Sequence, residues 1–261
     1  MIFCPLFSGS SGNSIFIKSK ETSILVDAGL SGKTIVNALS DINQSPEELK
    51  GILVTHEHGD HIKGVGILSR KYNIPIYANE KTWMAMEKSL GKLKEENIKV
   101  IHNNNLSINN LDIISYGTSH DAACPSGYAI SAEGKKVCIA TDLGCFSDEV
   151  KESIKDGDII LLESNHDLEM LKFGPYPYPL KRRVMSDVGH LSNEDCGKAI
   201  VSIAGYNKKN IILGHLSNTN NFPELALKTV SNILDEEGIS MKEGISLNLA
   251  RRDKPSCYVE I

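Results

Sequence analysis

The chain has 261 residues, which suits one large domain or two small ones and allows a substantial buried core. Hydrophobic residues make up 41% and charged residues 23%, as is ordinary for a soluble globular protein. The formal net charge of −5 argues against wholesale electrostatic coating of nucleic acid, although it leaves room for a local basic site.

The N-terminal stretch MIFCPLFSGSSGNS has no charged segment followed by a long apolar one, so we expect no signal peptide. Apolar runs of about 18 residues are absent from the sequence, so we expect no membrane span. The six cysteines are scattered without a C-x-x-C pair, as is typical of reduced thiols in a cytosolic protein. These features together predict a cytoplasmic location.

Strands and helices alternate along the chain, and no linker divides it. In the first part the hydrophobic patterns predict strands over 2–7, 14–19 and 23–29, a helix over 31–42, a strand over 51–55, a helix over 61–72, a strand over 74–78 and a helix over 80–91. The middle predicts strands over 98–102, 106–109, 111–117, 127–131 and 136–141, a helix over 147–156 and a strand over 158–163. The last part predicts a helix over 192–205, a strand over 210–214, a helix over 222–238 and strands over 245–250 and 256–261. This order indicates an α/β fold, a four-layer sandwich built as one domain over 1–261.

Polar residues follow five of the predicted strands directly or within a short loop. They are His56, His120, Asp142, Glu163 and His215. In α/β sheets, ligands bind at the carboxyl ends of the strands. We therefore expect these five side chains to meet in one pocket.

The stretch THEHGDH, residues 55–61, has the densest group of ionisable side chains. His56 and His58 are two residues apart, so in extended backbone they point the same way and can hold one metal ion. Asp60 and His61 follow a glycine that permits a turn, and they can hold a second ion. Imidazole and carboxylate ligands suit Zn²⁺, and also Mn²⁺ or Fe²⁺ as the carboxylate share rises. The alternative is a solvated polar loop.

The same stretch resembles the H-x-H-x-D-H signature of the metallo-beta-lactamase superfamily, and further landmarks of that family follow the expected order. ILVDAG contains Asp27, which in the family braces the metal loop. SHDAACPSGY, TDLG and GHLSNTNN supply His120, Asp142 and His215. The resemblance covers nearly the whole chain and implies the family's αββα sandwich with two divalent metal ions.

The resemblance also implies the ligands of each ion. One ion would be held by His56, His58 and His120, the other by Asp60, His61 and His215, and both by Asp142.

Two more residues resemble the tRNase Z group of this superfamily, in which a Glu after a strand orients a His that protonates the leaving oxygen. DIILLESNHD supplies Glu163, and SDVGHLSNEDC supplies His190. With Asp60 they form the expected catalytic set of a phosphodiesterase. A capping or buried role for His190 and a purely structural role for Glu163 remain as alternatives.

A basic triplet, Lys181, Arg182 and Arg183, lies upstream of His190 and follows Tyr176 and Tyr178. Such residues suit phosphate contacts and base stacking in a nucleic-acid channel. The alternative is a solvated loop with its charges facing water.

The combination of FSGSSGNS, THEHGDH, LLESNHD and GHLSNTNN resembles the YycJ/WalJ-type branch of small bacterial proteins. That resemblance implies a metal-dependent 5′-to-3′ DNA exonuclease connected with DNA repair, with DNA as the substrate. Three alternatives stay open: an RNA-processing nuclease of the tRNase Z type, a small-molecule thiolester or lactone hydrolase, and a non-catalytic metal-bound regulator of cell-wall signalling.

Overall fold

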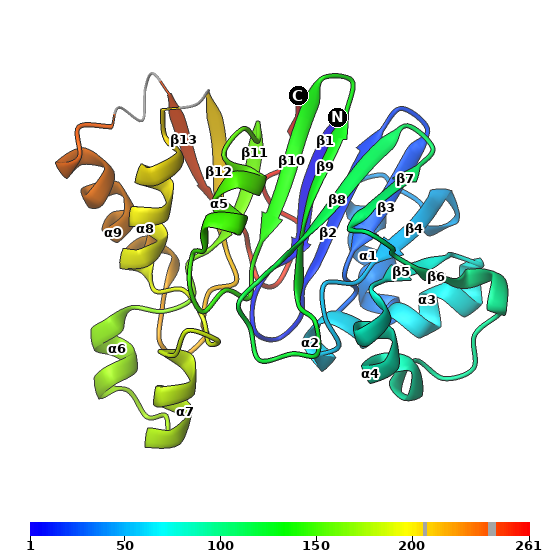
Figure 1. Cartoon of the computed structure of the whole chain (residues 1–261), viewed down its shortest axis with the longest axis horizontal. Coiled ribbons are helices and arrows are strands. Elements are labelled where there is room, and N and C mark those ends of the chain that lie inside the picture. The colour runs from blue at the N-terminus through cyan, green and yellow to red at the C-terminus, as the bar shows by residue number, and fades with distance from the viewer. Residues whose placement is uncertain (206–207, 240–243) are drawn as a thin grey trace.

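Two β-sheets pack face to face in the computed structural model, which describes residues 1–205, 208–239 and 244–261 (Figure 1). In the described residues each sheet has seven strands. The first sheet has the order β14-β1-β2-β3-β4-β5-β6, with β1 (Ile2–Phe7), β2 (Ser14–Ser19), β3 (Thr22–Val26), β4 (Leu49–Leu53), β5 (Ile76–Ala78), β6 (Ile98–Val100) and β14 (Val259–Glu260). The second has the order β13-β12-β11-β10-β9-β8-β7, with β7 (Asn105–Ile108), β8 (Leu111–Gly117), β9 (Ser126–Ala132), β10 (Lys135–Ala140), β11 (Ile159–Glu163), β12 (Lys209–Gly214) and β13 (Ile245–Leu249).

Helices cover the outer face of each sheet. The first sheet packs against α1 (Gly32–Asp41), α3 (Val65–Tyr72) and α4 (Glu80–Leu90), and the second against α5 (Asp148–Ile154), α8 (Asn193–Ile203) and α9 (Pro223–Glu236). The short helices are α2 (Gly59–Ile62), α6 (Leu168–Phe173), α7 (Tyr178–Val184), η1 (Pro46–Glu48) and η2 (Glu95–Asn97). The predicted four-layer αββα sandwich is confirmed.

Continuous apolar runs form the inner strands because both faces of each sheet are covered. In β11, Ile159 and Leu161 lie in the core between the two sheets, whereas Ile160 and Leu162 pack against helices. Successive side chains of a strand point to opposite faces, so a strand in a four-layer sandwich needs apolar residues at every position. The apolar core between the sheets fixes the position of one sheet against the other.

The strand directions bring the predicted site residues to one edge. β3 and β4 pair in parallel in the first sheet, and β10, β11 and β12 pair in parallel in the second. β8 and β10 both lie antiparallel to β9, so they run in the same direction. Within each sheet these strands therefore end at the same edge, on the side where Figure 1 shows α2, α6 and α7.

The prediction of one helix over 61–72 is wrong, because α2 ends at Ile62 and α3 begins at Val65. Gly64 separates them, and its backbone N–H donates to the carbonyl of Ala28 at 2.7 Å. A Cβ at Gly64 would lie 2.4 Å from the carbonyl oxygen of Leu30. The chain therefore turns where only glycine can approach the neighbouring backbone.

The segment with the basic triplet, over which no helix is predicted and for which a solvated loop is the alternative, is helical. It contains α7, which begins after Pro177, and α6 precedes it. Only Leu171 of α6 and Val184 of α7 are buried, so neither helix shows the apolar periodicity by which helices are recognised. The last strand is also shorter than predicted, since β14 spans Val259–Glu260 of the expected 256–261.

Among the described helices, none is both long and apolar enough to cross a lipid bilayer.

We predict that Tyr128→Phe lowers the free energy of unfolding by about 1–3 kcal/mol, because it removes a buried hydrogen bond. Tyr128 lies on β9 with no exposed surface, and its hydroxyl donates at 2.6 Å to the carbonyl of Val54, which follows β4 in the other sheet. Urea denaturation measures the change. Tyr258→Phe, at a side chain 48% exposed, is the control and should change stability by less than about 0.5 kcal/mol. Equal stability of both variants would contradict a tie between the sheets at this point.

Candidate metal centre

The His-rich stretch leaves β4 and enters α2 at the carboxyl edge of the sheets. His56 and His61 are buried, whereas His58 and Asp60 are partly exposed. Nε2 of His56 lies 3.1 Å from Nδ1 of His58, so these two rings converge. His61 sits in the single turn of α2. The loop therefore offers both a buried side and an accessible side to a ligand.

A first group of possible ligands consists of His56, His58 and His120, whose ligand atoms all lie within 4.8 Å of one another. His120 follows β8, and its Nδ1 lies 3.1 Å from the carbonyl oxygen of Gly189. Because a carbonyl only accepts hydrogen bonds, this contact places the ring proton on Nδ1 and leaves Nε2 as the ligand atom.

A second group consists of Asp60, His61 and His215, again within 4.8 Å. Asp142 stands between the two groups. One of its carboxylate oxygens lies 3.4 Å from Nε2 of His61. The other lies 3.6 Å from Nε2 of His215 and 3.7 Å from Nε2 of His120. This is the position from which a carboxylate can contact two ions at once.

Three residues at this edge leave their strands in the left-handed backbone region. Asp27 after β3, Asp142 after β10 and His215 after β12 have φ of 60°, 58° and 55°. That conformation costs an L-residue about 1–2 kcal/mol, although Asp and His tolerate it better than bulky residues. Non-glycine residues in this region gather at functional sites, where the surrounding structure holds them.

Asp27 braces the His-rich loop. Its carboxylate accepts hydrogen bonds from the backbone N–H of Thr55 at 2.9 Å and from the Thr55 hydroxyl at 2.8 Å. It also lies 2.7 Å from Nδ1 of His61. Because the carboxylate accepts the Nδ1 proton, Nε2 of His61 is directed toward Asp142.

The donor set fits a divalent metal. Oδ2 of Asp142 and Nε2 of His215 are buried, and neither has a hydrogen-bond partner among the residues described. A buried polar atom without a partner costs about 1–3 kcal/mol, more if it is charged. A cation held between these atoms removes that cost, and imidazole with carboxylate is the ligand chemistry of Zn²⁺, Mn²⁺ and Fe²⁺.

Glu163 holds two histidines at once. Its Oε1 lies 2.8 Å from Nδ1 of His190 and 2.7 Å from Nδ1 of His215, and its Oε2 accepts from the backbone N–H of Leu143 at 2.7 Å. Burial by itself raises a carboxyl pKa, but His190 and His215 outweigh it and lower the pKa of Glu163 to about 2. Glu163 is therefore an anion that orients both rings.

The carboxylates also hold protons on two of the histidines. Burial by itself lowers a histidine pKa, but at His215 the Asp142 and Glu163 carboxylates outweigh it and raise the pKa to about 10. At His61, Asp27 and Asp142 outweigh burial in the same way and raise the pKa to about 9. Both rings are therefore imidazolium cations at neutral pH, with a proton on each nitrogen. A metal ion bound there would replace one of these protons.

The basic triplet lies on α7, outside the two groups of ligands. Nη2 of Arg183 donates to Asp121 at 3.0 Å, and Nζ of Lys181 donates at 2.8 Å to the carbonyl of Lys172. Arg182 is exposed. Asp121 directly follows His120, one of the possible ligands, so Arg183 connects α7 with the rim of the centre. The carboxylate of Asp121 balances the charge of Arg183.

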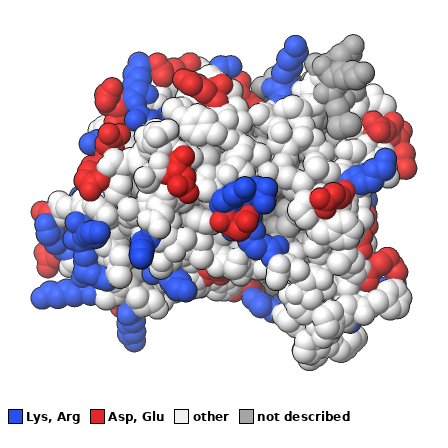
Figure 2. All heavy atoms as spheres, turned by 180° about the vertical axis from the view of Figure 1, so that it is seen from behind, with Lys and Arg blue, Asp and Glu red and all other residues white. Residues whose placement is uncertain are grey.

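Charge on the rear face is mixed. Figure 2 shows acidic and basic side chains intermixed over much of that face, with Lys and Arg gathered toward the side of α3 and α4. The face in this view carries both signs rather than a basic track, in keeping with a net charge of −5.

Two asparagines that the sequence motifs did not single out contact the centre. Oδ1 of Asn13 accepts from the backbone N–H of Gly9 at 2.9 Å, and its Nδ2 lies 3.1 Å from Nε2 of His61. Nδ2 of Asn165 donates at 2.8 Å to the carbonyl of His215. The only sequence signal for Asn13 is its place in the Gly/Ser-rich stretch FSGSSGNS, which by itself indicates a turn.

Known proteins resemble this chain in sequence and in structure. Residues 8–215 match the metallo-beta-lactamase superfamily. The chain is 43% identical over 247 residues to exodeoxyribonuclease YycJ of Bacillus anthracis, with 94% of each chain covered. It is 46% identical over 239 residues to exodeoxyribonuclease WalJ of Streptococcus pneumoniae serotype 2, with 90% of this chain and 89% of that one covered. The crystal structure of the metallo-beta-lactamase fold protein YhfI from Bacillus subtilis is 15% identical and has a TM-score of 0.71, over 98% of this chain and 100% of that one. The resemblance to the YycJ/WalJ-type branch is thus confirmed, and the chain belongs to the metallo-beta-lactamase superfamily.

Proposed function

We propose that this chain is a phosphodiesterase that depends on two divalent metal ions and degrades DNA as an exonuclease. The observation that carries the proposal is the Glu163–His190 pair, 2.8 Å apart, beside a buried Asp142 that faces two groups of ligands. Two relatives at 43% and 46% identity that bear the name exodeoxyribonuclease support DNA as the substrate.

The proposed ligands follow the geometry of the two groups. They are His56, His58 and His120 for one ion, Asp60, His61 and His215 for the other, and Asp142 for both. Zn²⁺ and Mn²⁺ suit this set, and Fe²⁺ is compatible with it. Bound ions of this kind lower the pKa of water and neutralise phosphoryl oxygens.

The chain's own side chains supply the remaining steps. His190, oriented through its Nδ1 by Glu163, would give a proton to the departing oxygen of the phosphodiester. Asp60, at the partly exposed mouth of the centre, would contact the attacking water as well as a metal ion. Asp27 would keep the His-rich loop in place while the phosphodiester is cleaved.

The finer parts of the proposal rest on the motif resemblance. We propose 5′-to-3′ polarity, a role in DNA repair and a cytoplasmic location. Lys181, Arg182 and Arg183 would contact the phosphate backbone at the rim of the centre, and Arg182 is the most available of them because Arg183 is bound to Asp121 and Lys181 to a carbonyl.

We expect purified wild-type protein to release nucleotides from end-labelled duplex DNA when Mn²⁺ or Zn²⁺ is titrated into metal-stripped samples. Asp142→Ala should reduce this activity about a thousandfold or more and lower the metal content, since several kcal/mol of charge stabilisation are lost. Asp41→Ala, at an exposed carboxylate, is the control and should leave both unchanged. No cleavage of DNA by fully loaded wild type would refute the proposal, and RNA, thiolester and lactone substrates would then be tested.

His190→Ala should lower kcat on DNA about 10²–10⁴-fold while the metal content stays the same, because a proton donor and not a ligand is removed. With bis(p-nitrophenyl) phosphate the loss should be much smaller, because p-nitrophenolate leaves without protonation. His102→Ala, at an exposed histidine, provides the control. Equal losses on both substrates would sink the assignment of His190 as the acid.

Metal binding should release protons at neutral pH. His61 and His215, with pKa values raised to about 9 and about 10, are protonated in metal-free protein at pH 7, and ligands must lose their protons. The apparent affinity should therefore rise from pH 7 toward pH 9. Titration calorimetry in buffers of different ionisation enthalpy measures the released protons, and a binding enthalpy that does not depend on the buffer would contradict the prediction.

A further inference from the structure

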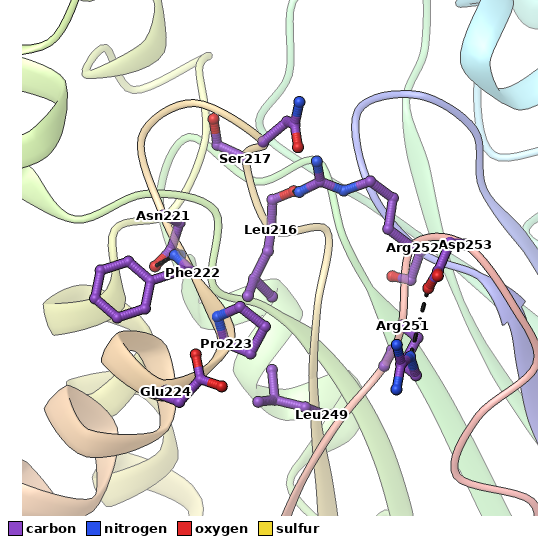
Figure 3. Close-up of a pocket in the computed structure, with 13 residues that line it drawn as sticks. Leu216, Ser217, Asn221, Phe222, Pro223, Glu224, Leu249, Arg251, Arg252 and Asp253 are labelled. Carbon is purple, nitrogen blue, oxygen red and sulfur yellow. Dashed lines mark hydrogen bonds and ion pairs between the residues drawn. The ribbon is translucent and has the colours of Figure 1, made fainter.

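A cavity of about 690 Å³ lies between the start of α9 and the chain that follows β13 (Figure 3). Its wall includes Leu216, Phe222, Pro223, Leu249 and Arg252. None of these residues belongs to the metal centre or to the proposed chemistry. The volume is large enough for one nucleotide unit, since ligand pockets of about 300–1,000 Å³ hold molecules of that size.

Residues of the cavity wall are linked to the metal centre along the chain and by a hydrogen bond. Leu216 directly follows His215, and the hydroxyl of Ser8, which also lines the cavity, accepts from the backbone N–H of His215 at 2.9 Å. Ser8 begins the loop over residues 8–13, at whose other end Asn13 reaches His61. Ser10 and Ser11 are exposed between these ends. The loop over residues 8–13 therefore connects the wall of the cavity with His215 and His61 of the metal centre.

The two ends of the cavity differ in chemistry, as Figure 3 shows. At one end the guanidinium of Arg252 lies beside Ser217, and its Nη2 donates to the carbonyl of Leu216 at 2.7 Å. At the other end lie the ring of Phe222, which is 46% exposed, and the carboxylate of Glu224. Leu216, Pro223 and Leu249 form an apolar floor between them.

Arg252 is the cation available to an anionic ligand. A guanidinium has five N–H donors, and the bond to Leu216 fixes its position while using one of them. Over the described ranges, no carboxylate lies within 4.0 Å of its charged nitrogens, whereas the neighbouring Arg251 lies 3.4 Å from Asp253. Two carboxylates line the cavity: Asp253 is paired with Arg251, and Glu224 repels phosphate from the opposite end, so an anion is favoured at Arg252 and an uncharged group at Phe222.

We propose that this cavity binds the deoxynucleotide next to the scissile bond, with its phosphate on Arg252 and its base against Phe222 and the apolar floor. The inference rests on the proposed nuclease function. It assigns substrate binding to residues outside the basic triplet. Stacking on an aromatic ring tolerates any base, which suits an enzyme that must accept each nucleotide in turn.

The test compares binding and chemistry in the metal-loaded protein. Arg252→Gln should raise the Kd for a fluorescent single-stranded oligonucleotide about tenfold and reduce the slope of log K against log salt by about 0.7, because one phosphate contact is lost. Phe222→Leu should also raise the Kd about tenfold but leave the salt slope unchanged, because it removes stacking and no charge. Lys254→Gln removes an exposed charge that does not line the cavity, and should change the Kd less than about twofold.

Hydrolysis of bis(p-nitrophenyl) phosphate by Lys254→Gln should stay within about twofold of wild type, because Lys254 lies outside both the cavity and the metal centre. If Arg252→Gln binds the oligonucleotide like Lys254→Gln, the cavity assignment is wrong even though wild type degrades DNA. If wild type binds the oligonucleotide through Arg252 and Phe222 but cleaves no phosphodiester, the nuclease function is wrong and the binding site stands. Absence of binding by wild type would overturn both.

Discussion

The buried carboxylate of Asp142 is the constraint on which the rest of the centre depends. It lies within 3.4–3.7 Å of imidazole nitrogens of His61 in the His-rich loop, of His120 in the loop after β8 and of His215 directly after β12. An isolated buried anion is strongly unfavourable, so those rings must bring protons or share a cation with it. The left-handed backbone at Asp142 and His215 is tolerated because this cluster holds both residues in position.

Glu163 connects a proposed metal ligand with the proposed acid. One of its oxygens contacts both His215, a proposed ligand, and His190, the proposed acid. The other accepts a backbone N–H from Leu143 in the loop that carries Asp142. A shift of any of these groups therefore moves the others. The fully buried carboxylate at the end of this apolar strand thus fixes the positions of both rings and of the loop.

Substrate binding on an acidic protein has to be local. The triplet on α7 is prominent in the sequence, but Arg183 is balanced by Asp121 and Lys181 bonds to a carbonyl. Arg252 stands out much less in the sequence, where Arg251, Asp253 and Lys254 surround it, and only the folded chain places it in the cavity wall while Asp253 pairs with Arg251. Proximity to His190 in the sequence favours the triplet, whereas the hydrogen bond between His215 and Ser8 of the cavity wall favours Arg252.

The layers of the fold and the side chains at the strand ends follow from the residue pattern along the chain. Short apolar runs such as ILV before His56 and IILL before Glu163 indicate strands buried on both faces, and the polar residues that follow them are expected at the sheet edge. The residue pattern could not place α6 and α7, because helices with one buried residue each have no periodic signal. Three features emerge only on folding: the double contact of Glu163, the approach of Asn13 to His61 and the hydrogen bond of Arg252 to Leu216. Each of these joins residues distant in the chain, and which distant residues meet depends on how the two sheets pack.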